Sequence, residues 1–443
     1  MILTFGIRIN SLYNNLKIRN TMKSLSILLF VISIYALSFI CPDLDLQSNI
    51  REGLSYEVSH YEKKITNEWG AAETKKLNLK EFDVFSGEEG FAYNHHPQIT
   101  FYKGKLLATW SSGIYNEDEP GQVMMLSISK DEGASWSNPT PIFDKKKGEH
   151  NNLVYTSEGI LVYGDTLVAF CGVNDSERYL EVKQDEIYPK PISGDKLPYQ
   201  LIPTTDQRTE IKTSIDGGLS WSESKIIIEG FIPNLKPVQT NEGRYILPGN
   251  MSFPYNDGNP IRDPWVLSPV DGLPKEFIDA PRWFQVTQKQ INAPFEFCEA
   301  SVVQMEDGTL KSMLRTDKKY LAVTWSKDNG DHWSEPQLSD YTDCGSRFEF
   351  GRLPDGRYFG ITCPEPKSVR TPMILAISED GVHYNEHFIL GDEAATTARI
   401  SGRWKYGRYG YPSYLVKGEV IYVVYSVNKE DIRMVKFPLS QLN

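Results

Sequence analysis

Five short segments contain side chains that can transfer protons or bind an anion. In chain order they hold two adjacent histidines, a cluster of acids, a Glu and an Arg on either side of an Asp-Gly turn, a second Arg, and a tyrosine-rich run. They read "NHHP" (94–97), "YNEDEPGQ" (115–122), "CEASVVQMEDGTLKSMLRTD" (298–317), "SVRTPMILAISEDG" (368–381) and "YGYPSYLVKG" (409–418). Imidazoles and carboxylates act as general acids and bases, and guanidinium groups bind carboxylates in bidentate fashion. A site can form from them only if the fold brings these distant segments together.

A repeated polar turn is the first sign of such a fold. The pattern Ser-x-Asp-x-Gly-x-x-Trp occurs within 127–136, at 214–221 and at 326–333, with a shortened copy at 378–384. The Asp can accept backbone N–H bonds within its own turn, and the aromatic ring can bury itself against a neighbouring sheet. We therefore predict structural, not catalytic, roles for six residues. They are Asp131, Trp136, Asp216, Trp221, Asp328 and Trp333.

A second repeat places a glycine turn before an apolar strand. The six glycines of these turns, from Gly104 to Gly418, are separated by 60, 79, 65, 48 and 62 residues. Each interval has room for about four short strands, and none shows a helical period. Six such units predict an all-β chain folded as a six-bladed β-propeller. The alternative is a seven-bladed ring, with a further blade in the stretch 180–240.

The N-terminal region does not carry these repeats. Residues 1–38 are interpreted as a signal peptide, because Met22-Lys23 precedes an apolar run, 25–34, and small residues near Ser38. We expect export to the periplasm or cell exterior, with a lipid anchor at Cys41 as an open alternative. Residues 39–85 are expected to form a lead-in that supplies a ring-closing strand, and residues 86–443 the propeller.

Composition excludes some partners and cofactors. The net charge of −11 and the absence of a Lys/Arg block argue against nucleic acid as a partner. The four cysteines after Cys41 show no metal-binding spacing, and we interpret them as buried thiols in preference to disulfides. They are Cys171, Cys298, Cys344 and Cys363. We expect a monomer that needs neither a metal nor a cofactor.

The spaced Ser-x-Asp-x-Gly-x-x-Trp turns on an all-β chain resemble the Asp-boxes of the sialidase superfamily, and the resemblance covers roughly 88–440. It implies a propeller of sialidase type and an exo-acting glycoside hydrolase. It also implies roles for particular residues. Tyr411, or Tyr409 nearby, would be the nucleophile and Glu299 its base. Arg315 and Arg370 would bind a substrate carboxylate, and Asp118, flanked by Glu117 and Glu119, would be the acid.

The sequence departs from that family at one part of the site. An "RIP" motif is expected at the start of the first blade, but the chain reads "YNHHPQI", so that His95 or His96 stands where an Arg is expected. The expected "LYE" of the last blade reads "VYS", which puts Ser426 in place of the Glu that would brace that Arg. A three-arginine clamp for sialic acid is therefore incomplete. Two Arg, two His and a Tyr would suit an anionic sugar such as a uronate.

Two further functions follow from the "NHHP" segment. It resembles propeller uronate lyases and α-L-rhamnosidases that act next to glucuronate. In a lyase, His96 would abstract the proton and Arg315 would neutralise the carboxylate. A propeller that binds glycans without catalysis is the third reading. In all three the partner is an oligosaccharide or polysaccharide, and an anionic one is expected.

Overall fold

A computed structural model of the 443-residue chain describes residues 64–175, 206–250, 252–272 and 295–443. Strands form six sheets in this part of the chain, and its only helix is a 3₁₀ turn, η3 (Leu439–Leu442). The all-β prediction is confirmed. The predicted signal peptide, 1–38, and Cys41 lie outside the described residues.

The first three sheets follow one another along the sequence. The first contains β3 (Tyr93–Tyr102), β4 (Lys105–Gly113), β5 (Val123–Ser129) and β6 (Thr140–Phe143). The second contains β7 (Val154–Tyr163), β8 (Thr166–Asp175), β9 (Asp206–Ser214) and β10 (Lys225–Glu229). The third contains β11 (Val238–Gln239), β12 (Tyr245–Ile246) and β13 (Tyr255–Asn256).

The last three sheets continue this order. The fourth contains β14 (Phe297–Gln304), β15 (Leu310–Thr316), β16 (Tyr320–Ser326) and β17 (Gln337–Thr342). The fifth contains β18 (Glu349–Arg352), β19 (Tyr358–Thr362), β20 (Met373–Ser378) and β21 (Glu386–Gly391). The sixth contains β22 (Tyr409–Lys417), β23 (Val420–Val427) and β24 (Asp431–Pro438).

The glycine repeat marks the same turn in every sheet. Each of the six glycines lies between the first and second strands of its sheet, with φ between 56° and 99°. Such positive φ values are the reason for glycine at hairpin turns. Six sheets are the number that six blades require, while the blade count itself stays a prediction. Of the stretch 180–240, residues 206–229 belong to the second sheet through β9 and β10.

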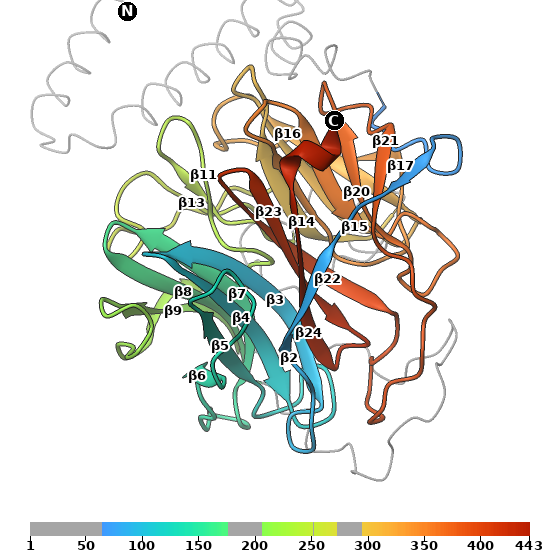
Figure 1. Ribbon diagram of the computed structural model, residues 1–443. Helices are drawn as coiled ribbons and strands as arrows, with labels where there is room; N and C mark the ends of the chain where they lie inside the picture. Colours follow the sequence, from blue (N-terminus) through green and yellow to red (C-terminus); the bar gives the residue numbers. More distant parts are fainter. Residues whose placement is uncertain (1–63, 176–205, 251, 273–294) are drawn as a thin grey trace, which may run out of the picture. The chain divides into compact units, whose positions relative to one another are not determined.

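The lead-in joins the two ends of the described chain. Its strand β1 (Thr74–Lys76) pairs in parallel with β21, and β2 (Lys80–Phe85) pairs antiparallel with β24. Figure 1 shows blue β2 running beside dark-red β24. The sixth sheet therefore takes its outer strand from the other end of the sequence.

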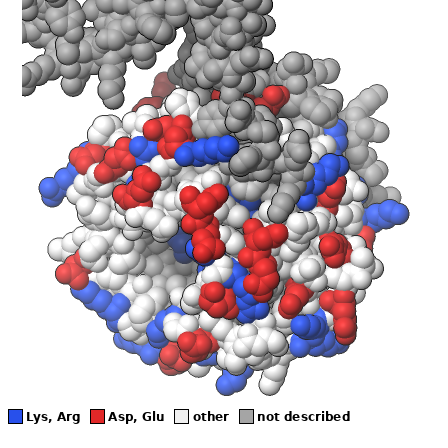
Figure 2. All heavy atoms as spheres, turned by 90° about the horizontal axis from the view of Figure 1, so that it is seen from above, with Lys and Arg blue, Asp and Glu red and all other residues white. Residues whose placement is uncertain are grey.

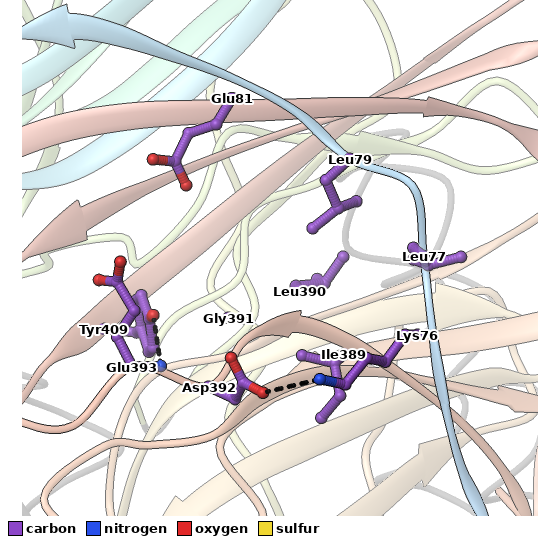
Figure 3. Close-up of a pocket in the computed structure, with 10 residues that line it drawn as sticks. All are labelled: Lys76, Leu77, Leu79, Glu81, Ile389, Leu390, Gly391, Asp392, Glu393 and Tyr409. Carbon is purple, nitrogen blue, oxygen red and sulfur yellow. Dashed lines mark hydrogen bonds and ion pairs between the residues drawn. The ribbon is translucent and has the colours of Figure 1, made fainter.

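A cleft of about 240 Å³ opens where the lead-in passes from β1 to β2 (Figure 3). Leu77 and Leu79 of the lead-in line it together with Leu390, toward which Leu79 points, and an ion pair of 3.9 Å joins Lys76 to Asp392. Tyr409 also lines this cleft. None of the site residues predicted from the sequence, apart from this alternative tyrosine, lines it.

The Asp-box turns connect the third and fourth strands of four sheets. In the first sheet, Asp131 accepts hydrogen bonds from Ser129 Oγ at 2.8 Å and from the backbone N and Oγ of Ser135 at 2.9 and 2.5 Å. The same pattern surrounds Asp216 and Asp328. These bonds stabilise the carboxylate, so that the pKa of Asp131 is lowered to about 2.

The aromatic residue of each turn packs against the preceding sheet. Trp333, with 0% of its surface exposed, lies in one cluster with Ile246 and Phe253 of the third sheet region. Trp221 packs on a cluster that joins the first and second sheets, and Trp136 packs on a cluster that joins the first and sixth. These contacts are the ones that a structural role for the Asp-boxes requires.

The first strands of the sheets lie against one another. β3 contacts both β7 and β22, and β18 contacts both β14 and β22. Residues far apart in the sequence thereby meet on these strands.

The surface drawn in Figure 2 carries Lys and Arg interspersed with Asp and Glu. No helix among the described residues has the length and apolar character needed to cross a membrane.

Candidate active site

Four first strands are interrupted by a β-bulge at a similar position. The register shifts fall between His95 and Gln98, Ser157 and Ile160, Cys298 and Ala300, and Gly410 and Ser413. The bulged segments contain His96, Glu158, Glu299 and Tyr411. A bulge re-aims a side chain, and bulges are frequent next to active sites.

Several of these residues have a backbone conformation that is costly outside glycine. The φ angles are 55° at His96, 47° at Glu299 and 54° at Tyr411. Asp118 and Arg370, which lie on loops, have φ angles of 55° and 62°. Strained residues of this kind persist where the surrounding structure holds them, and they cluster at functional sites. Five of the seven catalytic and binding residues predicted from the sequence share this feature.

A tyrosine–glutamate pair forms the centre of the site. Tyr411 donates a short hydrogen bond from Oη to Glu299 Oε1. Arg315 donates from Nη1 to Glu299 Oε2 at 2.6 Å and to Tyr411 Oη at 3.3 Å. Burial has the largest single effect and raises the pKa of Glu299, but the charge of Arg315 and the hydrogen bonds from Arg315 and Tyr411, together with the charge of Arg347, outweigh burial and lower that pKa. Burial and the charge of Glu299 raise the pKa of Tyr411 well above its ordinary value. At rest the pair is therefore a neutral phenol and a carboxylate.

Two neutral imidazoles lie against the Tyr411 ring. Its centroid is 4.0 Å from that of His95 and 4.9 Å from that of His96. Burial lowers the pKa of both histidines well below the ordinary value, and neighbouring cationic groups add to this effect. His95 Nδ1 is bonded to Ser426 Oγ at 2.7 Å, and His96 Nδ1 to Ser111 Oγ at 3.2 Å. His95 and Ser426 thus face each other as a matched pair, in the two positions where the resemblance leads one to expect Arg and Glu.

Two buried guanidinium groups flank the same ring. The Arg370 guanidinium lies 5.6 Å from the Tyr411 ring centroid, and that of Arg347 lies 4.5 Å from it. Arg370 was expected from the sequence, whereas Arg347 was not. Three arginines therefore surround Tyr411, although the "RIP" arginine is absent.

The three carboxylates of the acidic loop, 115–122, have different surroundings. Glu119 accepts hydrogen bonds at 3.0 Å from the backbone N–H groups of Tyr115 and Asn116. Glu117 forms an ion pair of 2.5 Å with Lys429. Asp118 is half-buried, and the loss of solvent together with the charge of Glu117 raises its pKa to about 7. Of the three, Asp118 best matches the requirements of a general acid at neutral pH.

A metal-ion site can be tested against the same residues. His95, His96 and Glu117 each offer one ligand atom, and these atoms lie within 4.8 Å of one another. The ammonium of Lys429 already neutralises Glu117, and nearby guanidinium groups disfavour a further cation. The donor set fits a cation poorly, and the absence of a metal stays a prediction.

The structure distinguishes the two tyrosines that the sequence left open. Tyr409 lies in a hydrophobic cluster with Tyr425, and its hydroxyl accepts a hydrogen bond from Glu393 N at 3.2 Å. Tyr411 instead contacts Glu299. The Tyr409 backbone N–H donates to the Arg370 carbonyl at 3.0 Å, but of the two side chains it is that of Tyr411 that contacts Glu299, Arg315 and the two histidines.

The sequence reasoning missed three charged residues near this centre: Arg347, Glu158 and Lys429. Glu158 is on β7, and Arg347 lies two residues before β18. Both precede a glycine hairpin, in "TSEGILVYGD" (156–165) and "SRFEFGRLPDG" (346–356). Glu158 and Arg347 could have been identified by one signal. Each is a charged residue within, or just before, the apolar first strand of a repeat.

Comparison with known proteins places this chain in a family. The model of the BNR repeat-like domain matches residues 104–423, and the chain belongs to that family. No curated protein matches the sequence.

Solved structures of sialidases share the fold. One sialidase superposes with a TM-score of 0.54 at 18% identity, over 83% of this chain and 33% of its own length. The intramolecular trans-sialidase from Ruminococcus gnavus, in complex with oseltamivir carboxylate, has a TM-score of 0.57 at 13% identity, over 82% and 98%. A protein of unknown function from Dyadobacter fermentans has a TM-score of 0.55 at 15% identity, over 81% and 99%. The chain spans a third of the first structure's length and nearly all of the other two. At these identities the likeness shows a sialidase-type fold.

Proposed function

We propose that this protein is an exo-acting glycoside hydrolase that removes a terminal acidic or acid-adjacent sugar from a glycan. The observation that carries the proposal is the hydrogen bond from Tyr411 to Glu299, formed between two bulged strands and flanked by Arg315. Tyrosine is a known nucleophile in glycoside hydrolases of the sialidase type.

The pair supplies a nucleophile only during the reaction. As Tyr411 Oη attacks the anomeric carbon, its proton passes to Glu299 along their hydrogen bond. Arg315 Nη1, at 3.3 Å from the phenol oxygen, stabilises the negative charge that develops there. Because the resting phenol is neutral, no free phenolate has to be maintained in a buried site.

Asp118 completes the reaction from the loop after β4. With a pKa of about 7, it is largely protonated in mildly acidic medium and can protonate the leaving-group oxygen. In the second half, ionised Asp118 accepts a proton from water as the water displaces Tyr411, and Glu299 returns its proton to the phenolate. Atoms and charges balance over the two steps.

A uronate lyase is the second candidate, and a specific observation favours it. The rings of His95 and His96 are neutral and lie against Tyr411, so that either could accept a proton. Elimination would leave a double bond conjugated to the carboxylate, which absorbs ultraviolet light, whereas hydrolysis would not.

Turnover of three fluorogenic or oligosaccharide substrates tests the proposal: a sialoside, a glucuronide and a rhamnose-capped glucuronate oligosaccharide. We expect release by the wild type from at least one of them. Tyr411→Phe should lower kcat/KM by at least about 10³-fold, as removal of a nucleophile does. Tyr409→Phe is the matched control, since this tyrosine lies in a hydrophobic cluster, and it should retain activity.

Each other outcome selects a different function. Full activity of Tyr411→Phe would exclude this nucleophile. Ultraviolet absorbance of the product would favour the lyase. Saturable glycan binding without any product, from the folded wild type, would favour the non-catalytic propeller.

We further propose that the protein acts outside the cytoplasm, as a monomer, after export directed by residues 1–38. The apolar run 25–34 and the small residues after it support this proposal. Fractionation of cells that produce the full chain, with N-terminal sequencing of the mature form, would test it.

A further inference from the structure

Arg347 is buried in a state that a structural role alone does not explain. Its side chain is 1% exposed, and Nη1 donates to the backbone oxygen of Asn234 at 2.5 Å. Among the described residues, Nε and Nη2 have no hydrogen-bond partner. A buried donor without an acceptor costs about 1–3 kcal/mol, and more when it carries charge. Two such donors on one guanidinium indicate an acceptor that arrives with a ligand.

The carboxylate near Arg347 does not neutralise it. Glu158 Oε2 lies 3.9 Å from Arg347 Nη1, beyond hydrogen-bonding distance, and has no hydrogen-bond partner within the described part of the chain. Burial raises the pKa of Glu158 well above its ordinary value, which favours the neutral form of this group. Among the described residues, Arg347 therefore has no carboxylate hydrogen-bonded to it, although its charge also acts on Glu299.

Arg370 offers a second free donor beside the same ring. Its Nη1 is buried without a hydrogen-bond partner in the described residues. A Cβ at Gly410 would lie 3.3 Å from this Nη1 and 2.8 Å from His95 Cε1, so that a side chain there would crowd both groups. Arg315, by contrast, uses Nη1 to pair with Glu299 at 2.6 Å. The buried guanidinium donors beside this ring that have no partner among the described residues thus come from Arg347 and Arg370.

We propose that Arg347 is a substrate-binding residue whose Nε and Nη2 bind the carboxylate of the reacting sugar, together with Arg370. It supplies, from the segment before β18, the guanidinium that is missing at His95. The substrate class is then a glycoside whose reacting sugar itself carries a carboxylate, a uronate or a 2-ulosonate, and not a neutral sugar next to an acidic one. This inference rests on the proposed function, because the reacting sugar is the terminal sugar that the proposed hydrolase releases.

The test measures binding separately from turnover. Calorimetric titrations use D-glucuronate, D-galacturonate and N-acetylneuraminate as probes, with the methyl ester of each acid as its neutral counterpart. We expect the wild type to bind at least one acid 10-fold or more tightly than its ester. Arg347→Met should remove that preference, because a neutral thioether cannot pair with a carboxylate, while Arg347→Lys should keep part of it.

Arg352→Met is the matched control. Arg352 lies on β18 itself, and its side chain pairs with Glu306 at 3.7 Å, so that its removal should leave the preference unchanged. The proposal is overturned if Arg347→Met binds the acid as the folded wild type does. It is also overturned if the wild type binds acid and ester equally, or binds none of the three acids, and these results need no variant.

Failure of this inference is distinguishable from failure of the proposed function. Acid binding that depends on Arg347, without product from any glycoside of that acid, would refute the hydrolase and keep the binding residue. Turnover that depends on Tyr411 but is unaffected by Arg347→Met would support the hydrolase and refute the role of Arg347 in binding.

Discussion

The Asp-box turns and the bulged first strands both recur from sheet to sheet, yet they hold their carboxylates in different surroundings. Asp131 accepts bonds from residues within four positions of it, and these bonds lower its pKa. Glu158, on the bulged strand β7, and Asp118, on the loop after β4, lose solvent instead, and their pKa values are raised. The turns gain stability from their charges, whereas these two carboxyl groups of the site bear a cost. Such a cost is expected where a ligand or a reaction uses the group.

The largest expected effect would come from removing the base at the centre. Glu299→Gln leaves Tyr411 without a proton acceptor, and we expect kcat to fall by about 10²–10⁴-fold on whichever substrate the wild type turns over. The melting temperature should change far less than the rate. A variant that keeps full kcat would show that the hydrogen bond to Tyr411 has no catalytic use.

Removal of an Asp-box ring should give the opposite result. Trp333→Ala empties a fully buried space between two sheets, and we expect a loss of about 3–5 kcal/mol in the free energy of unfolding. Trp221→Ala is the matched comparison, because this ring is only half-buried and should cost less. Activity per folded molecule should be unchanged in both. A loss of activity at full stability would place the Asp-boxes in the site, against our interpretation.

The pH dependence of stability should differ between carboxyl groups of the Asp-box turns and those of the site. A carboxyl group with a raised pKa in the folded state destabilises that state increasingly as pH rises from about 4 to 7. Asp118→Asn should therefore raise stability by about 1–3 kcal/mol at pH 8, with no difference near pH 4. The favourable contribution of Asp131 is present above about pH 4 and is lost as pH falls toward 2. Urea unfolding of the wild type and Asp118→Asn between pH 3 and 8 would measure the first effect, and a stability difference between the two that does not grow from pH 4 to 8 would contradict it. Asp131→Asn, compared with the wild type in the same way, would measure the second.

The fold could be predicted from sequence because its signals are local. Each Asp-box places its Ser, Asp and Gly within a few residues, and each hairpin glycine marks one turn, so that a single sequence shows both. The Tyr411–Glu299 pair spans 112 positions and was reached only through the family resemblance.

The contacts of the remaining site residues could not be predicted, because no repeated motif shows which of these residues meet. Arg347 meets Asn234 across 113 positions, and Lys429 meets Glu117 across 312. These contacts depend on which first strands become neighbours, and on bulges that turn single side chains. Neither the choice of neighbouring strands nor the position of a bulge can be read from the alternation of polar and apolar residues or from the turn residues.

The pairing of β2 with β24 bears on how the chain is made. Asp83 and Arg433 are hydrogen-bonded neighbours although 350 positions separate them. A ribosome therefore releases the N-terminal partner long before its match exists, and the sixth sheet can be completed only after synthesis has reached the last strand. Until then β2 lacks its partner β24, and exposed strand edges invite aggregation. We expect productive folding to depend on keeping the growing chain away from other copies of itself, for example by a holding chaperone.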